Sequence, residues 1–382
     1  MADNTFIPYG KQWIDEDDIE AVCKVLRSDW LTTGPMVDAF ENSFKEFTGT
    51  SNAVAVSSGT AALHAVVSAL GVKPGDEIIV PPITFAATAN SVVYQGGTPV
   101  FADVFPDTLL IDPDSVKKRI SSKTRAVVAV DYAGQSCDYD KLNEIVKQQG
   151  IPLVADSCHA LGGSYKGRKT GNMADMTLFS FHPVKHITTG EGGMIVTPSA
   201  STAKKMRRFR NHGINSDHKT RSENGSWYYE MDELGFNYRL TDIQCALGIS
   251  QLKKLPQWIE KRNQIAGIYD DFFEGIQGVT PLKKLDYCVH AYHLYVVLFD
   301  NNCIKHTRAE VFSKLREMGI GVNVHYIPVH YHPFYKRKFG YSKGLCPQAE
   351  AAYEHMITLP LFPKMSQNDV ERVCDSVREA VK

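Results

Sequence analysis

The chain has 382 residues, of which 22% are charged, and its formal net charge at pH 7 is −1. This balance excludes nucleic acid and an anionic membrane surface as main partners, because both attract strongly basic proteins. The sequence holds no apolar run of the roughly 18 residues that could span a bilayer, no basic and apolar leader in Met1–Thr5, and no CxxC pair among its eight cysteines, so we expect a cytoplasmic protein with free thiols.

The first predicted helix runs from Asp15 to Leu26, where the apolar spacing is helical and Asp15 is a suitable N-cap. Further along, the apolar residues 53–56 predict a strand, which leads through the Ser-Ser-Gly-Thr turn at residues 57–60 into a helical pattern over residues 61–67. The first N–H groups of a helix have no partner within it and lie at the positive end of its dipole. The turn therefore suits a phosphate group.

Short apolar runs alternate with helical stretches from residue 53 to about residue 200. Such alternation predicts an α/β fold, in which helices cover both faces of a mostly parallel sheet. Beyond residues 53–56 the predicted strands cover residues 77–80, 99–102, 126–130, 151–155, 177–180 and 193–197. Asp156 directly follows one of them, and the carboxyl end of a buried parallel strand is where such sheets place ligand-binding groups.

Lys185 lies in a run rich in hydroxyl groups and glycine, residues 180–193, just before the last of these strands. A lysine in a loop is most often a solvated charge, so its meaning depends on the residues that accompany it. Here a phosphate-binding turn, Asp156 and Lys185 follow one another along the chain. Together they predict a site for pyridoxal 5′-phosphate (PLP), in which the turn binds the phosphate, the acid binds the ring nitrogen and the lysine forms a Schiff base.

After Leu240 the sequence predicts long helices through about residue 274. The remainder predicts strands at 292–298 and 322–324, a helix at 308–318 and a closing helix from Gln367. We therefore predict a large cofactor-binding domain over residues 1–250, from which the first ~30 residues could pack apart, and a small α+β domain over residues 251–382, led by a long helix.

Three histidines, His325, His330 and His332, lie close together in the sequence. Neither a CxxC pair nor an HExxH motif accompanies them, and zinc sites in proteins usually draw on such spacings. The sequence therefore predicts no metal site.

From about residue 6 to its end the chain resembles the DegT/DnrJ/EryC1/StrS-type PLP-dependent nucleotide-sugar aminotransferases. The markers that carry this resemblance occur in the family's order: Gly59-Thr60, Pro82-Ile83-Thr84-Phe85, Asp156, His159, Ser180, Lys185, Gly190-Glu191-Gly192-Gly193 and Asn237-Tyr238-Arg239. The resemblance implies a fold-type I PLP-dependent transferase, with a large domain built on a mostly parallel sheet and a smaller C-terminal α+β domain.

By this resemblance Lys185 carries the cofactor and acts as general base and acid in the proton shift of transamination. Asp156 keeps the pyridine nitrogen protonated, and His159 approaches the 3′ oxygen of the ring. For Asp156 the alternative is a helix N-cap after the strand, and for His159 it is a core histidine with its hydrogen bonds satisfied.

The resemblance also implies how the rest of the cofactor is held. Phe85 stacks on the face of the ring, although a lone phenylalanine is more often part of a core. Gly59 and Thr60 give backbone N–H groups to the phosphate, and Ser180 gives its hydroxyl group. Asn237 occupies the position from which the family reaches into the phosphate site of a partner subunit, so we expect a homodimer with shared active sites.

Residues that contact the substrate are less distinct in the sequence. By resemblance, Leu31 and Thr32 lie at one border of the sugar and nucleotide site, and His325 and Tyr326 lie at another. Arg239 is a candidate for the α-carboxylate of an amino donor, because guanidinium groups match carboxylates; a structural salt bridge is the alternative.

Within the family, the stretches 130–135, 156–162, 180–182, 237–240 and 324–326 resemble most the aminotransferases of the pseudaminic acid pathway. That resemblance implies amination of C4 of a UDP-linked 2-acetamido-4-keto-6-deoxy-L-hexose, with L-glutamate as donor. The product would be UDP-4-amino-4,6-dideoxy-N-acetyl-beta-L-altrosamine.

Other functions stay open at this point. The nearest is a sugar 4-aminotransferase for a D-configured UDP-, GDP- or dTDP-linked 4-keto-6-deoxy sugar. In the dehydratase branch of the family histidine replaces the catalytic lysine, so Lys185 argues against that branch. An ordinary amino-acid aminotransferase fits the chemistry but not the resemblance along the whole chain. A PLP-binding regulator without turnover usually carries a DNA-binding module or a broken site, and the sequence has neither.

Overall fold

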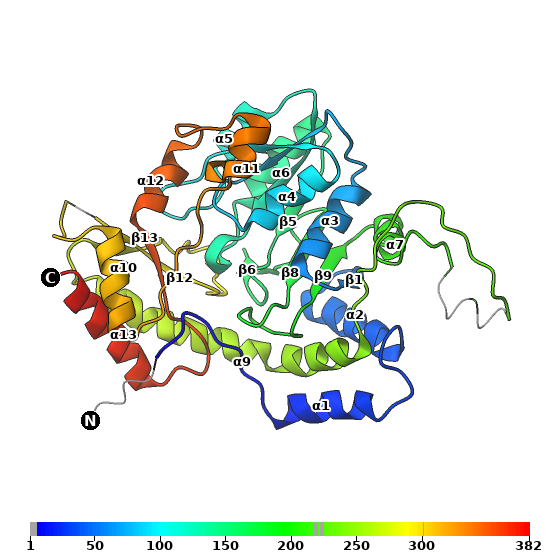
Figure 1. Ribbon diagram of the computed structural model, residues 1–382, viewed down its shortest axis with the longest axis horizontal. Helices are drawn as coiled ribbons and strands as arrows, with labels where there is room; N and C mark the ends of the chain where they lie inside the picture. The colour runs from blue at the N-terminus through cyan, green and yellow to red at the C-terminus, as the bar shows by residue number, and fades with distance from the viewer. Residues whose placement is uncertain (1–5, 217–220, 222–224, 301) are drawn as a thin grey trace.

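A seven-stranded sheet forms the centre of the molecule (Figure 1). In this computed structural model, which describes residues 6–216, 221, 225–300 and 302–382, the strand order is β1-β9-β8-β5-β4-β2-β3. Strand β9 runs antiparallel to both of its neighbours, and the other pairs are parallel, so the predicted sheet is confirmed. The strands are β1 (Asn52–Val56), β2 (Glu77–Val80), β3 (Thr98–Phe101), β4 (Thr124–Val130), β5 (Leu153–Asp156), β8 (Met176–Ser180) and β9 (Gly193–Thr197).

Helices cover this sheet on both faces. Successive side chains of a strand point to opposite faces of a sheet, so an apolar strand needs a core on each side. Val54 and Val56 of β1 belong to the core that also contains α3, α4 and α7, whereas Ala53 and Ala55 belong to the core that contains α2 and α9. The helices of this part are α1 (Glu16–Leu26), α2 (Pro35–Thr48), α3 (Gly59–Ala69), α4 (Ala86–Tyr94), α5 (Pro113–Arg119), η1 (Tyr132–Gly134), α6 (Tyr139–Gln149) and α7 (Ala200–Phe209).

The C-terminal part of the chain forms a second core around the three-stranded sheet β10-β12-β13. Helices α10 and α13 contact each other and pack around that core. The elements of this core are β10 (Val279–Pro281), β12 (Tyr295–Phe299), α10 (Arg308–Glu317), β13 (Met356–Leu359) and α13 (Gln367–Ala380). The C-terminal part also includes η2 (Val329–Tyr331), α11 (Pro333–Phe339) and α12 (Pro347–His355), whose buried residues pack into the core of the central sheet. A small antiparallel sheet has the strand order β11-β6-β7, with β11 (Cys288–Val289), β6 (Ser164–Tyr165) and β7 (Arg168–Lys169).

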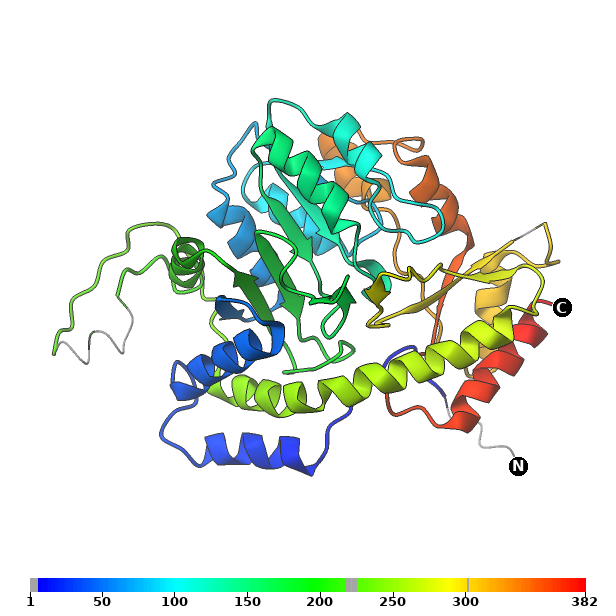
Figure 2. The ribbon, with the colours of Figure 1, turned by 180° about the vertical axis from the view of Figure 1, so that it is seen from behind.

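A single helix, α9 (Asp242–Phe273), connects the two cores (Figure 2). The sequence predicted several helices here, which is wrong: Pro256 lies inside α9 without ending it. Leu252 and Leu255 of α9 pack into the core of the central sheet, and Tyr269 and Phe273 pack into the second core. Residue 250 lies within this helix, and the division at that residue stays a prediction. In the part of the chain that the structure describes, no helix combines the length and the apolarity that crossing a membrane requires.

Two predicted strands of the C-terminal part differ in the structure. Strand β12 starts three residues later than predicted, because Tyr292 has a φ of 45°, in the left-handed region that does not continue a strand. Residues 322–324 form no strand. Asn323 exchanges backbone hydrogen bonds with Thr358, but the next N–H group, that of Val324, donates to the side chain of Asn323, so the pairing ends after one residue.

A buried carboxylate joins three elements of the large part. Glu41 of α2 is 5% exposed, and its two oxygens accept hydrogen bonds from Arg207 (2.8 Å) and Arg210 (2.6 Å), both at the end of α7. The N–H group of Ala55 in β1 also donates to it, at 3.0 Å. Burial opposes ionisation of Glu41, but Arg210 and Arg207 outweigh this effect and lower its pKa below the usual 4.5. The ionised carboxylate therefore stabilises the fold.

Glu41→Gln should lower the free energy of unfolding at pH 7 by about 2 kcal/mol, because two charged hydrogen bonds to arginine are lost. A group with a lowered pKa stabilises above its usual pKa and loses that effect as the pH falls through its pKa in the folded protein. The difference from the wild type should therefore shrink below pH 4.5, as denaturant unfolding at several pH values would measure. Glu46→Gln, at an exposed position of the same helix, is the control. A difference that persists unchanged into acid would contradict the assignment.

Candidate active site

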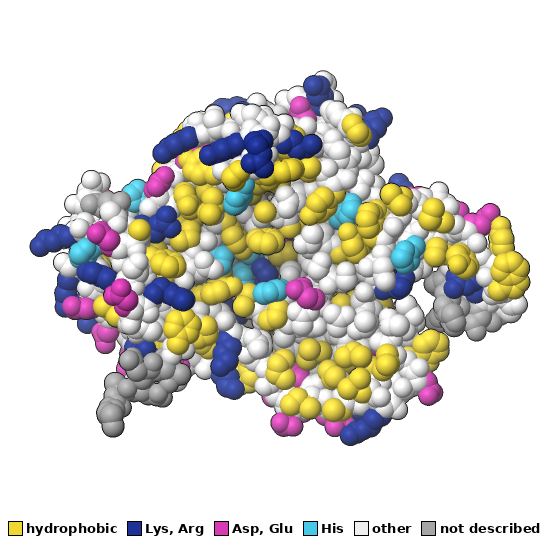
Figure 3. All heavy atoms as spheres, viewed as in Figure 1, with side chains coloured by type: hydrophobic (Ala, Val, Ile, Leu, Met, Phe, Trp, Pro, Cys, Tyr) yellow, Lys and Arg dark blue, Asp and Glu magenta, His cyan; other side chains and the backbone are white. Residues whose placement is uncertain are grey.

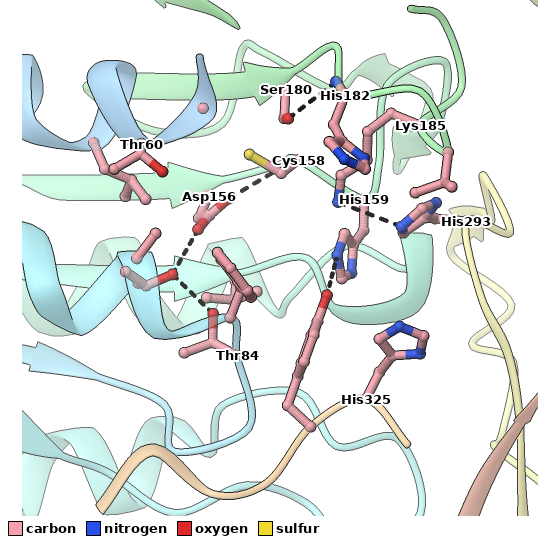
Figure 4. Close-up of a pocket in the computed structure, with 18 of the residues that line it drawn as sticks. Thr60, Thr84, Asp156, Cys158, His159, Ser180, His182, Lys185, His293 and His325 are labelled. Carbon is pink, nitrogen blue, oxygen red and sulfur yellow. Dashed lines mark hydrogen bonds between the residues drawn. The ribbon is translucent and has the colours of Figure 1, made fainter. Parts of the chain in front are cut away.

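Apart from Asn237, the residues predicted to bind a cofactor meet in one cavity of about 550 Å³ (Figure 4). Val130, Asp156 and Ser180 reach it from the carboxyl ends of β4, β5 and β8, which lie side by side in the sheet. This edge is where parallel sheets carry their ligands. The predicted residues that line the cavity are Gly59, Thr60, Phe85, Asp156, His159, Ser180, Lys185, His325 and Tyr326. On the face seen in Figure 3, histidine, lysine and acidic side chains gather near the hollow at the centre.

The start of α3 forms one wall of the cavity. Ser58 caps this helix by accepting a hydrogen bond from the N–H group of Ala61 at 3.0 Å, and the next residues, Gly59 and Thr60, line the cavity. A Cβ atom at position 59 would lie 2.9 Å from Cβ of Ser180, so the close approach of these two segments requires glycine. The free N–H groups of this helix start and the Ser180 hydroxyl form a cradle that suits a phosphate group.

Asp156 is held in the cavity wall by two hydrogen bonds. Its Oδ2 accepts from the Thr88 hydroxyl at 2.8 Å, and its Oδ1 accepts from the N–H group of Cys158 at 3.3 Å. The Thr84 hydroxyl lies 2.8 Å from that of Thr88, which extends the network. Turns rather than a helix follow Asp156, so the alternative interpretation as a helix N-cap is wrong. The carboxylate is fixed in orientation and lines the cavity.

Lys185 lies in the loop after β8, and its Nζ is 3.3 Å from Nε2 of His293. Burial lowers the pKa of the Lys185 amine below the usual 10.5, while Cys158 and Asp156 oppose this shift. The neutral amine is therefore present at a lower pH than in an exposed lysine. A neutral amine is the form that attacks a carbonyl group.

His159 lines the cavity, and one of its two ring nitrogens makes a hydrogen bond with a neighbouring side chain. Its Nε2 lies 3.1 Å from the Tyr326 hydroxyl, while its buried Nδ1 has no hydrogen-bond partner among the described residues. Burial, followed by the nearby Lys185, holds the pKa of His159 well below 6.5, so the imidazole is neutral. The alternative of a core histidine with both nitrogens satisfied is wrong. The free nitrogen leaves capacity for one polar contact from a bound molecule.

Phe85 and the segment at His325 and Tyr326 form the opposite wall. The Phe85 side chain is 61% exposed, so it is not part of a core, and its ring centroid lies 6.1 Å from that of Tyr326. His325 Nδ1 contacts the Thr358 hydroxyl at 2.9 Å, and the carbonyl group of His325 accepts a hydrogen bond from Tyr132. Burial lowers the pKa of His325 to about 3, so this histidine is neutral as well.

Four predicted residues lie outside this cavity within one chain. Asn237 is exposed and pairs with Asn211, whose Oδ1 accepts a hydrogen bond from Arg239 at 2.7 Å. Leu31 and Thr32 are exposed beside the start of α9. The partner of Arg239 is an amide rather than an acid, so the alternative of a structural salt bridge has no support from this contact.

Thr88 and His293 are among the cavity residues that sequence reasoning missed. Thr88 lies three residues after Phe85, one helical turn along α4, and a hydroxyl at that spacing is a signal that could have pointed to it. His293 fell inside a predicted strand 108 residues from Lys185, and no pattern in the sequence connects them. In residues 6–216, 221, 225–300 and 302–382, no group of three or more histidine, cysteine or acidic side chains could hold a metal ion.

The residues present fit PLP. The cavity offers a helix start for a phosphate, a fixed carboxylate for a ring nitrogen, an exposed aromatic ring for stacking and an amine for an aldehyde. The unpartnered Nδ1 of His159 also leaves room for a polar group of the ring. This donor set combines the groups that the sequence pattern predicted.

The DegT/DnrJ/EryC1/StrS aminotransferase family matches residues 12–378. The spore coat polysaccharide biosynthesis protein SpsC of Bacillus subtilis is 42% identical, over 99% of this chain and 98% of the relative. UDP-4-amino-4,6-dideoxy-N-acetyl-beta-L-altrosamine transaminase of Campylobacter jejuni is 39% identical, over 98% of each chain. UDP-4-amino-4-deoxy-L-arabinose--oxoglutarate aminotransferase of Shewanella sediminis is 36% identical, over 99% of each chain.

Solved structures agree along the whole chain. Helicobacter pylori PseC, an aminotransferase involved in pseudaminic acid biosynthesis, has a TM-score of 0.92 and 34% identity and covers 99% of each chain. A Streptococcus pneumoniae protein in its PLP form has a TM-score of 0.91 and 33% identity and covers 98% of each chain. Aminotransferases of this family depend on PLP, so the predicted cofactor is confirmed, as is the fold-type I class.

In cofactor-free protein, Lys185 should react with an amine-selective acylating reagent at a lower pH than an ordinary lysine. The lowered pKa means that its neutral amine appears below the usual 10.5, and only the neutral amine reacts. Peptide mass spectrometry across a pH series would measure the profile, with exposed Lys24 as the reference for reagent activity. A midpoint for Lys185 at or above 10.5 would contradict the effect of burial.

Proposed function

Because this chain belongs to the DegT/DnrJ/EryC1/StrS aminotransferase family, we propose that it aminates C4 of a UDP-linked 2-acetamido-4-keto-6-deoxy-L-hexose, with L-glutamate as the amino donor. The product would be UDP-4-amino-4,6-dideoxy-N-acetyl-beta-L-altrosamine, for pseudaminic acid biosynthesis. The full-length similarity to the Campylobacter jejuni transaminase carries this choice, and the fold of Helicobacter pylori PseC supports it. The coarser statement, that the chain is a sugar aminotransferase of this family, does not depend on the sugar.

The cavity residues have the following roles in the proposal. When bound, PLP supplies a ring that withdraws electrons from the carbon that loses a proton. Asp156 keeps the ring nitrogen protonated, and its hydrogen bond from Thr88 orients the carboxylate toward the cavity. Phe85 stacks on the ring face, and His159 approaches the 3′ oxygen through its free Nδ1.

The phosphate end and the amine complete the site. Gly59 and Thr60 donate backbone N–H groups to the phosphate, and Ser180 donates its hydroxyl. Lys185 binds the cofactor covalently and, once free, moves a proton at the substrate carbon. Its lowered pKa suits this work, because a proton carrier is most effective when its pKa approaches the working pH.

We place the sugar nucleotide between the large and the C-terminal parts. His325 and Tyr326 border the cavity on the C-terminal side, and both side chains stay neutral at pH 7, since burial lowers the pKa of His325 and raises that of Tyr326. Neutral donors and acceptors suit sugar hydroxyl and carbonyl groups. Arg239 is the candidate for the carboxylate of L-glutamate.

The active unit in this proposal is a homodimer with shared sites. Asn237, Arg239, Leu31 and Thr32 lie outside the cavity of their own chain and would contribute to that of a partner. The segment after α7 extends away from the body of the molecule (Figures 1 and 2), and its described side chains include exposed apolar ones. These are Trp227, Tyr228, Tyr229, Met231 and Leu234. A partner subunit would remove this apolar surface from water.

The test of the substrate uses both C5 epimers of UDP-2-acetamido-4-keto-6-deoxy-hexose, each incubated with the protein, PLP and L-glutamate. We expect amination of the L-epimer alone, detected by mass spectrometry and by NMR of the product at C4. A UDP-4-keto pentose is the comparison substrate, since a UDP-4-amino-4-deoxy-L-arabinose aminotransferase is among the relatives. Turnover of only the D-epimer or only the pentose would overturn the choice of sugar and leave the transamination chemistry intact.

Mixed dimers test the shared sites. Lys185→Ala and Asn237→Asp chains should each be inactive alone, because one lacks the amine and the other places a negative charge beside a phosphate. In a mixed dimer one of the two sites would combine Lys185 of one chain with Asn237 of the other, so about half of the wild-type activity should return. Native mass spectrometry would verify the mixed species. A verified mixed dimer without activity would contradict shared sites.

A further inference from the structure

His293 contacts the amine of Lys185 from the other part of the molecule. Its Nε2 lies 3.3 Å from Lys185 Nζ, and its ring lines the cavity (Figure 4). The residue belongs to the segment just before β12, and it is 6% exposed. Its other nitrogen, Nδ1, is buried without a hydrogen-bond partner among the described residues. Of the two ring nitrogens of His293, Nε2 therefore has a hydrogen-bond partner among the described residues, which is Lys185 Nζ.

Among the described residues, the titratable groups that act on His293 come from three other segments, and none of them is an acid. Lys185 and His186 come from the loop after β8, with the His186 ring centroid 5.6 Å away. His159 lies after β5, with its ring centroid 4.4 Å away, and Arg262 lies on α9. Burial, followed by the nearby basic groups Lys185, His159, His186 and Arg262, which oppose a further positive charge, holds the pKa of His293 well below 6.5. The imidazole is therefore neutral at pH 7.

A neutral imidazole beside an amine restricts how the two can bond. One ring nitrogen carries a proton and the other accepts. If Nε2 accepts, the amine donates one N–H to it, and the single lone pair of Nζ points elsewhere. If Nε2 donates instead, it occupies the lone pair that must attack a carbonyl carbon. The two arrangements have opposite consequences for an amine that has to react.

We propose that His293 is a positioning residue for Lys185: Nε2 accepts a hydrogen bond from Nζ and directs the amine's lone pair into the cavity. The inference rests on the proposed function only in that the amine reacts with the aldehyde of PLP. In that step Nζ forms a double bond to the aldehyde carbon, and the aldehyde oxygen leaves as water with both amine protons. Whenever the amine is released during turnover, the same contact holds it.

The experiment measures how fast cofactor-free, full-length protein takes up PLP over a pH series, from the absorbance of the bound cofactor. At high pH the amine is fully neutral, so the plateau rate reports its orientation and not its protonation. His293→Phe keeps a ring but loses the acceptor, and its plateau rate should fall roughly tenfold, as expected for one lost hydrogen bond. His293→Gln keeps an acceptor and should stay within about threefold of the wild type.

The pH at which the PLP uptake rate reaches half of its plateau is a second readout. A role of His293 in packing alone would leave this midpoint unchanged. A neutral acceptor stabilises the charged ammonium more than the neutral amine, because hydrogen bonds from charged donors are stronger. The midpoint for His293→Phe should therefore move to lower pH, while that for His293→Gln stays near the wild type. His306→Gln is the control, since His306 Nε2 lies 2.7 Å from Lys314 Nζ in a partly exposed pair away from the cavity.

An unchanged plateau in His293→Phe, or equal losses in the Phe and Gln variants, would overturn the proposal. Nitrogen-15 NMR of the unsubstituted cofactor-free protein tests it without any folding risk from a substitution at His293. The signal of His293, assigned from its absence in His293→Gln or by selective labelling, should show Nδ1 protonated and Nε2 unprotonated. A protonated Nε2 would overturn it. No sugar nucleotide enters these measurements, so a wrong substrate assignment leaves their outcome unchanged.

Discussion

The site depends on one constraint, which is that parallel strands carry their carboxyl ends to the same edge of a sheet. The carboxyl ends of β4, β5 and β8 lie next to one another at this edge. Val130 pairs with Asp156, and Asp156 pairs with Leu178, two residues before Ser180. Helix α3 starts at the same edge, so its free N–H groups face the carboxylate across the cavity. A helix start that suits an anion and a carboxylate thereby line the same cavity.

Burial then lowers the pKa of the lysine and of the histidines that line this cavity. Asp156 accepts hydrogen bonds from the Thr88 hydroxyl and from the N–H group of Cys158, so its buried oxygens have partners. The amine of Lys185 and the imidazole of His293 lie 3.3 Å apart, and burial lowers the pKa of both. A neutral amine, rather than an ammonium, is the form that attacks a carbonyl group.

The far wall of the cavity comes from the C-terminal part, and the packing of α9 holds the two parts together. Its N-terminal half packs on the central sheet and its C-terminal half on the second core, so residues from both parts can meet at fixed distances. Tyr132 adds a direct link, since its hydroxyl donates to the carbonyl group of His325. His293 and Tyr326 thereby approach Lys185 and His159 although the chain separates them by more than a hundred residues.

The sequence by itself determined the sheet strands, the helix start at α3 and the order of cradle, acid and lysine, because local periodicity and strand ends are encoded by neighbouring residues. It also determined the family, through markers spread along the chain. Only the tertiary structure decided that α9 is continuous through Pro256, that residues 322–324 form no strand, and that Thr88 and His293 join the site. Their partners lie 68 and 108 residues away, and contacts over such distances depend on how the two cores pack rather than on any local pattern.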